Sequence, residues 1–300
     1  MRRDYVRLPP LPSKPAPDVS YFCRGICATI VSVIRTRILT AWPWQTPRTL
    51  GQRLAARLAG ACLLWLMLGG TGAAADVIAV DAADAPFMYA ADGQAAGIYP
   101  LLIAEAYRRI GQPVTIAAMP WKRALDGADN NLNGIGGLYK TAGRLEKYDY
   151  SDKLLDETLL IYVRKGHPFP FQTIADLKGR SVGVIRGWSY GDAFDDARAG
   201  GLFTVEEAAG DDQTFAMLDV GHIDCIIAIR EAADATVAAH GWGPEFEPLA
   251  VPLSSTPSYV AFNKAAGKED ELHRFNDAIA AMRADGTFQR LTEMAFKGGG

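Results

Sequence analysis

The chain has 300 residues, 49% of them hydrophobic and 22% charged, which is typical of a soluble, core-forming chain and not of collagen, disorder or a polytopic membrane protein. The formal net charge of −3 is unevenly distributed. Residues 1–75 contain 10 basic and 2 acidic side chains, which leaves a net charge of −11 for residues 76–300. This acidic portion is a poor candidate for binding nucleic acid, because phosphate neutralisation requires a basic surface.

The basic segment 1–75 predicts a cleavable export signal. Arginines precede an apolar run at 58–68, and small residues follow it up to a cleavage site near Ala75. The apolar run covers only about half of the roughly 20 residues that span a bilayer. We therefore expect an exported protein, and residues 1–47 are left out of the fold prediction.

Cysteine usage is consistent with a core that needs no internal disulfide. Three of the 4 cysteines lie in the leader, so only Cys225 remains after cleavage. Cys225 belongs to the apolar run 223–229 and is expected to be a buried core thiol.

After residue 76, short β-rich runs alternate with amphipathic stretches. This alternation predicts a largely parallel sheet with helices on both faces. The expected strands are 77–80, 114–118 and 134–138, and the expected helices are 100–110 and 121–128.

A second α/β series follows a long extended segment at 154–164. Its expected strands are 181–185, 203–206 and 223–229, and its expected helical segments are 173–177, 192–199 and 213–219, the last capped by Asp211 and Asp212. The chain is then expected to run extended at 258–263 and to end in helices at 269–284 and 286–296. Two extended connections between two lobes favour a hinged protein with a ligand cleft.

Two motifs suggest chemistry at this cleft. The sequence Gly187-Trp188-Ser189-Tyr190-Gly191 has the spacing of a hydrolase nucleophile elbow, but no oxyanion segment precedes it, so we favour an anion site at a helix start. Thr141 is expected to cap a helical turn carrying Arg144, whose guanidinium suits a carboxylate. The alternatives are a surface role for Arg144 and a core role for Trp121. The scattered histidines predict no metal site.

Several segments, in their order and spacing, resemble the amino-acid-type extracellular solute-binding proteins of bacterial ABC transporters, family 3. The resemblance runs from about residue 77 to 296 and is carried by 85–87, 97–98, 120–121, 141–144, 148–151, 176–179, 182–184, 221–224 and 284–288. It implies the α/β type II periplasmic-binding-protein fold, with two lobes that are each a mostly parallel sheet flanked by helices. The expected lobes are 76–164 with 255–300, and 165–254, joined by two hinge strands.

The family resemblance also implies a function. We expect a monomeric periplasmic protein, without enzyme activity or cofactor, that captures a small carboxylate-bearing ligand for an ABC permease. In this family Arg144 would hold the ligand carboxylate, assisted by Thr141 and by a helix start at Gly187 to Ser189. Trp121 would stack on the ligand, and Asp81 would lie near its ammonium group. The other expected ligand-binding residues are Phe87, Gly137, Tyr139 and Trp188.

One departure leaves the ligand open. The family commonly has an acidic partner for the α-ammonium group five residues after the position of Asp224, and here that position is Ile229. An acidic amino acid, a dicarboxylate or another small organic anion is therefore also considered. Lys140 and Arg230 either make the pocket more cationic or are solvated at its rim.

Two other functions on the same scaffold are kept as alternatives. One is an exported lyase of the cyclohexadienyl dehydratase type, for which Asp81, Glu231 and His222 are the candidate acids or bases. The other is a sensory domain that works without a transporter.

Overall fold

The structure, a computed structural model, describes residues 76–298, with side chains up to residue 296. These residues belong to one compact unit. The predicted signal peptide and its cleavage site lie outside the described residues. Within 76–298, no helix combines the length and the hydrophobicity that crossing a membrane requires.

The first half of the chain builds a parallel sheet around a central strand. This strand, β1, pairs in parallel with a neighbour on each side, and two helices make the crossovers. The elements are β1 (Asp76–Asp81), α3 (Ile98–Ile110), β5 (Val114–Met119), α4 (Trp121–Asp129) and β6 (Gly134–Tyr139). Gly111 ends α3 in the left-handed conformation with φ 68°, which glycine adopts without steric cost.

A small antiparallel sheet follows β1 and was not predicted. It consists of β2 (Ala83–Asp84), β3 (Met88–Ala91) and β4 (Gln94–Ala96). Strands this short carry too few residues for a visible alternation of apolar and polar side chains.

The second half repeats the parallel arrangement. Strand β9 lies between β10 and β11 and is parallel to both. The elements are η2 (Ile174–Leu177), β9 (Ser181–Ile185), α6 (Asp192–Ala199), β10 (Thr204–Ala208), α7 (Asp211–Asp219), β11 (Cys225–Ile229), α8 (Arg230–His240) and β12 (Phe246–Pro248). Cys225 is buried in β11, as predicted, and burial raises the pKa of its thiol to about 12.

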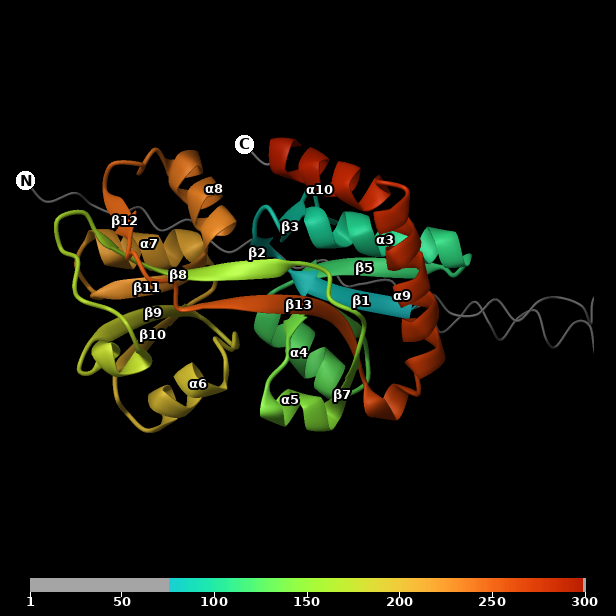
Figure 1. The fold of residues 1–300 in the computed structure, drawn as a ribbon, viewed down its shortest axis with the longest axis horizontal. Coiled ribbons are helices and arrows are strands. Elements are labelled where there is room, and N and C mark those ends of the chain that lie inside the picture. Colours follow the sequence, from blue (N-terminus) through green and yellow to red (C-terminus); the bar gives the residue numbers. More distant parts are fainter. Residues whose placement is uncertain (1–75, 299–300) are drawn as a thin grey trace, which may run out of the picture. The chain divides into compact units, whose positions relative to one another are not determined.

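Two long strands, β8 (Asp156–Arg164) and β13 (Ser254–Asn263), connect the two halves and run lengthwise between them (Figure 1). They pair antiparallel with each other and complete the order β10-β9-β11-β8-β13-β6-β1-β5. The predicted fold class, with two α/β lobes and two connecting strands, is confirmed. The predicted lobe limits stay a prediction. Because β8 pairs with β11 and β12 from residue 159 onward, we propose that the chain crosses between lobes near residue 156.

The C-terminal helices pack against the first half. α9 (Glu269–Ala284) and α10 (Thr287–Gly298) both contact α3, on one side of the sheet (Figure 1). Tyr107 and Phe275 join α3 to α9, with ring centroids 5.9 Å apart. The remaining elements are α5 (Ala142–Lys147), β7 (Tyr148–Tyr150) and η3 (Lys264–Ala266).

Two predicted helix starts are wrong. α7 begins at Asp211, so Asp211 and Asp212 lie in its first turn and do not cap it. α6 begins at Asp192, so Gly187 to Ser189 form a turn before the helix and not its start. Helix α8 has no counterpart among the predicted elements.

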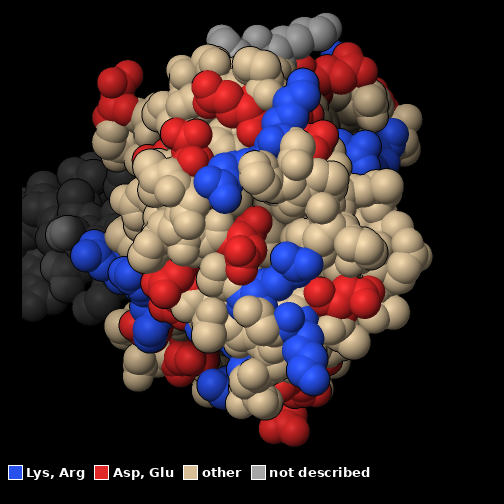
Figure 2. Space-filling model, turned by 90° about the vertical axis from the view of Figure 1, so that its left-hand side faces the viewer, with Lys and Arg blue, Asp and Glu red and all other residues tan. Residues whose placement is uncertain are grey.

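Charges on the outer face of the second half are mixed. Figure 2 shows acidic and basic side chains interspersed over this face. A face of this kind does not offer the continuous basic surface that phosphate binding requires.

Candidate functional site

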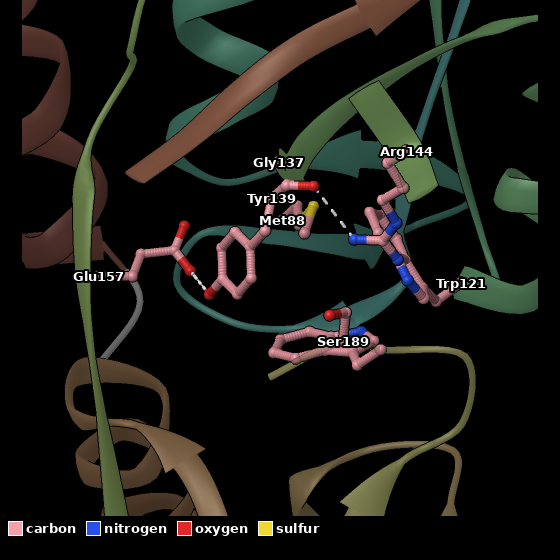
Figure 3. Close-up of a pocket in the computed structure, with 8 residues that line it drawn as sticks. Met88, Trp121, Gly137, Tyr139, Arg144, Glu157 and Ser189 are labelled. Carbon is pink, nitrogen blue, oxygen red and sulfur yellow. Dashed lines mark hydrogen bonds between the residues drawn. The ribbon is translucent and has the colours of Figure 1, made fainter. Parts of the chain in front are cut away.

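A small cavity lies where the two halves meet, and we call it the binding cavity (Figure 3). Its walls come from both halves of the chain. The lining residues are Met88, Trp121, Gly137, Tyr139, Arg144, Glu157, Trp188 and Ser189. The structure therefore brings together Trp121, Gly137, Tyr139, Arg144, Trp188 and Ser189 among the residues expected from the sequence.

Arg144 supplies the positive charge of the binding cavity. Thr141 caps α5 as predicted, since its Oγ1 accepts the backbone N–H of Arg144 at 3.2 Å. The guanidinium donates to the carbonyl of Tyr139 at 3.2 Å, and no acidic side chain within 76–296 forms a salt bridge with it. Burial lowers the pKa of Arg144. A guanidinium has five N–H donors, so most of them remain for a ligand.

Aromatic rings form the apolar walls of the cavity. The ring of Trp188 lies 6.3 Å from that of Trp121 and 6.4 Å from that of Tyr139, both with edge-to-face geometry. Gly137 lies in β6 with φ 81°, and a Cβ there would approach the Met88 side chain to 2.7 Å. Glycine at this position therefore leaves room for Met88 to pack.

Glu157 is a lining residue that the sequence prediction missed. It lies on β8, is 2% exposed, and accepts hydrogen bonds from the hydroxyls of Tyr99 and Tyr139. Burial raises its pKa to about 7. An acidic residue just before the apolar run 159–163 was the available signal, since such runs form buried strands. Met88, the other missed residue, carries no comparable signal.

Three expected residues lie outside the lining. Phe87 is 2% exposed and stacks on Tyr99 with ring centroids 5.9 Å apart, so it is part of the core. Thr141 caps α5 beside the cavity. Asp81, at the end of β1, accepts a hydrogen bond from Nε1 of Trp188 at 3.1 Å and lines a neighbouring pocket.

The hydrolase-like motif lacks the partners that hydrolysis needs. The hydroxyl of Ser189 donates to the carboxylate of Asp195 and accepts the N–H of Gly191 at 3.2 Å. No histidine contacts Ser189 among the described hydrogen bonds. Ser189 is thus a polar wall residue whose activation as a nucleophile has no visible base.

The two cationic residues considered from the sequence lie outside the cavity. Lys140 is exposed, with Nζ 4.1 Å from the ring centroid of Tyr259, and Arg230 lines a separate groove beside α8. Within the described part of the chain, no cluster of three or more His, Cys, Asp or Glu side chains is arranged to hold a metal ion.

Comparisons with known proteins agree on one family. The model of bacterial extracellular solute-binding proteins, family 3, matches residues 77–298. The L-cystine-binding protein TcyJ of Escherichia coli (strain K12) is 30% identical over 217 residues, covering 70% of this chain and 78% of TcyJ. The histidine-binding periplasmic protein of Salmonella typhimurium is 26% identical and covers 73% of this chain and 86% of its own length.

Solved structures support the same fold. The arginine-, lysine-, histidine-binding protein ArtJ of Geobacillus stearothermophilus superposes with a TM-score of 0.63 at 20% identity, covering 75% of this chain and 96% of ArtJ. At this identity the likeness speaks for the fold alone.

Proposed function

The chain belongs to the bacterial extracellular solute-binding proteins, family 3, and from this we propose that it captures a small amino-acid-type ligand in the binding cavity. The observation that carries the proposal is Arg144, whose partly buried guanidinium faces the cavity without an acidic partner among the described side chains. A ligand carboxylate would receive charge-assisted hydrogen bonds from it.

The rest of the lining offers apolar contacts to a ligand. Trp121, Tyr139 and Trp188 offer apolar surface for the body of the ligand. Because the lining comes from both halves, a bound ligand would hold them together, which is how hinged binding proteins close.

The cellular role forms part of the same proposal. We infer that the chain works as a monomer in the periplasm and delivers its ligand to an ABC permease. Relatives named as L-cystine-binding and histidine-binding periplasmic proteins support this role. The export signal predicted within residues 1–75, with its apolar run at 58–68, is consistent with it.

The variant Arg144→Ala tests the carboxylate site. Calorimetry and thermal unfolding of the wild type with a panel of amino acids and small organic acids should first identify a ligand. At a hundredfold excess over Kd, that ligand should stabilise the protein by about 2.7 kcal/mol. In Arg144→Ala we expect this stabilisation to disappear, because the carboxylate loses its charged partner.

Arg123→Ala is the matched control, since Arg123 is an exposed arginine on α4, two residues from Trp121. Its ligand-induced stabilisation should equal that of the wild type. Undiminished stabilisation in Arg144→Ala would remove Arg144 from the site.

An exported lyase remains a second candidate because of Glu157. A carboxyl with a pKa near 7 in a ligand cavity suits general acid or base catalysis. The acids and bases named from sequence, Asp81, Glu231 and His222, do not line this cavity. Incubation with arogenate or prephenate distinguishes the two functions: we expect both compounds to be recovered unchanged, whereas their conversion would establish an enzyme.

A further inference from the structure

Most side-chain donors that line the binding cavity already have an acceptor in the protein. Three of them donate to carboxylates. These pairs are Tyr139 with Glu157, Ser189 with Asp195, and Trp188 with Asp81. A hydroxyl or an indole has a single hydrogen to donate, so these three donors are not free for a ligand.

Two lining donors remain, and Figure 3 shows both on the side of the cavity opposite Glu157. The guanidinium of Arg144 makes one hydrogen bond among the described residues, to the carbonyl of Tyr139. Nε1 of Trp121 is buried and has no hydrogen-bond partner within the described part of the chain. The residue is 5% exposed, and a buried N–H group without an acceptor is rare and costly in folded proteins.

The N–H edge of Trp121 lies where the two halves meet. Trp121 is the first residue of α4, in the first half of the chain. A Cβ on Gly187 would lie 3.5 Å from Cδ1 of Trp121, so the ring edge formed by Cδ1 and the adjoining Nε1 lies beside the turn before α6, in the second half. Gly187 and Arg144 also line one groove next to the cavity, which places the indole N–H and the guanidinium near the same border of the cavity.

The residues expected to assist Arg144 do not take that role in this structure. Oγ1 of Thr141 accepts the backbone N–H of Arg144, and Thr141 lies outside the lining. Gly187 to Ser189 precede α6 and are not its start. A carboxylate has two oxygens with about four acceptor positions, and one guanidinium leaves part of them unfilled. The unpaired N–H of Trp121 is the lining donor that can fill one.

We propose that the indole N–H of Trp121 donates a hydrogen bond to the ligand carboxylate that Arg144 holds. The proposal rests on the proposed function and adds a second donor to its carboxylate site. Trp121 is then a specificity-determining residue and not just apolar surface. Because an indole N–H can donate but not accept, it favours a carboxylate over a carboxamide, whose NH₂ group would leave one of the two donors unpaired.

The test replaces Trp121 with β-(3-benzothienyl)alanine, in which a sulfur atom takes the place of the N–H and the double ring keeps its size. Trp121→Phe is a second variant that also lacks the N–H. Calorimetry measures binding of the common L-amino acids and of the carboxamide of the tightest one. Trp242→Phe is the control, since Trp242 packs on Phe215 and Phe246 outside the cavity lining.

We expect the tightest amino acid to lose about tenfold in affinity in both Trp121 variants, because a hydrogen bond to a charged group is lost. Every L-amino acid that binds should lose by a similar factor, since all share the carboxylate. The preference of the wild type for the amino acid over its carboxamide should shrink in the benzothienyl variant. Trp242→Phe should bind within twofold of wild type.

Thermal unfolding without ligand adds a measurement that a structural role would change. The benzothienyl variant should unfold at the same temperature as the wild type or higher, because the N–H has no partner to lose. A lower unfolding temperature would show that the N–H is already bonded inside the protein and would overturn the proposal.

Two binding results would also overturn it. Affinity within twofold of wild type in the benzothienyl variant would do so even if Trp121→Phe binds more weakly, because the loss would then come from the shape of the ring. A loss confined to amino acids with acceptors in their side chains would place the hydrogen bond away from the carboxylate.

Failure of this inference can be told from failure of the proposed function. If Arg144→Ala abolishes binding and the benzothienyl variant leaves it unchanged, the proposed function stands and the role of Trp121 is wrong. If no amino acid binds the wild type, the proposed function fails and the inference fails with it.

Discussion

Acidic side chains gather at both ends of β1, and the two groups are neutralised differently. At the start of the strand, Asp76 and Glu271 share the ammonium group of Lys268 at 2.5 and 2.8 Å. Gln112 donates to both carboxylates, and the hydroxyl of Tyr107 donates to Glu271. At the end of the strand, Asp81, Asp84 and Asp211 line a small pocket, the acidic pocket, whose lining contains no Lys, Arg or His.

The two groups differ in their counterion: the group at the start of β1 pairs with Lys268, and the acidic pocket has no cation in its lining. The network around Glu271 joins β1, α9 and the segment after α3, and it carries its own counterion, so its stabilising effect needs nothing from outside. The acidic pocket leaves like charges together in a poorly solvated place, which disfavours the ionised folded state. Carboxyl groups with strongly raised pKa values that lie together in a cleft are often found at functional sites.

The largest predicted effect on stability comes from breaking the complete network. Glu271→Ala would leave Lys268, Gln112 and Tyr107 with fewer acceptors and would open a cavity at a residue that is 4% exposed. Because Lys268 is partly exposed and keeps Asp76, we expect a loss of about 2–3 kcal/mol in the free energy of unfolding. Urea denaturation measures it.

Asp277→Ala controls for that substitution, since Asp277 is exposed in the middle of the same helix. It should change the free energy of unfolding by less than about 0.5 kcal/mol. Equal stability of wild type and Glu271→Ala would show that the network does not hold α9. It would contradict the claim that the charges at the start of β1 stabilise the fold.

A second effect is the pH dependence of the ligand-free protein. The raised pKa values of Asp211 and Glu157, both about 7, mean that the folded state keeps protons that the unfolded state releases near pH 4. The free energy of unfolding should therefore fall as the pH rises from about 4.5 to 7.5. Asp76 acts in the opposite sense, since its lowered pKa makes its contribution disappear only as the pH falls below about 4.

Urea denaturation at several pH values between 4.5 and 8 measures this slope. Asp211→Asn should flatten it, because the asparagine does not titrate. Stability that rises with pH across this window in the wild type would contradict the account of the acidic pocket.

Much of the scaffold could be predicted from the sequence because its elements are long and periodic. Helix α9 was predicted at 269–284 and is found there, and the strands at 114–118 and 134–138 are one residue longer than expected. Strands β2 to β4 were missed because pairing across tight turns, and not their own pattern, makes them strands.

Arg144 and the acidic pocket could be predicted from the sequence to different degrees. Arg144, with Thr141 as its cap, could be recognised from a local motif because the residues that position it are neighbours in sequence. Asp84 and Asp211 are more than 100 residues apart, and only the fold brings them together and removes water from them. Phe87 lies next to lining residue Met88, yet its ring faces Tyr99, a direction that sequence does not reveal.

The smallest predicted effect concerns Lys140, the cation that the sequence offered as a pocket residue. Its ammonium group lies over the rings of Tyr259 and Tyr150, at 4.1 and 5.2 Å from their centroids, and outside both cavity linings. Lys140→Met should lower stability by less than about 1 kcal/mol, because an exposed cation–π contact contributes about 0.5–1 kcal/mol. Ligand affinity should stay within twofold of wild type by calorimetry, since solvent and salt screen an exposed charge. A loss of affinity as large as that in Arg144→Ala would contradict this prediction and would show that Lys140 takes part in ligand binding.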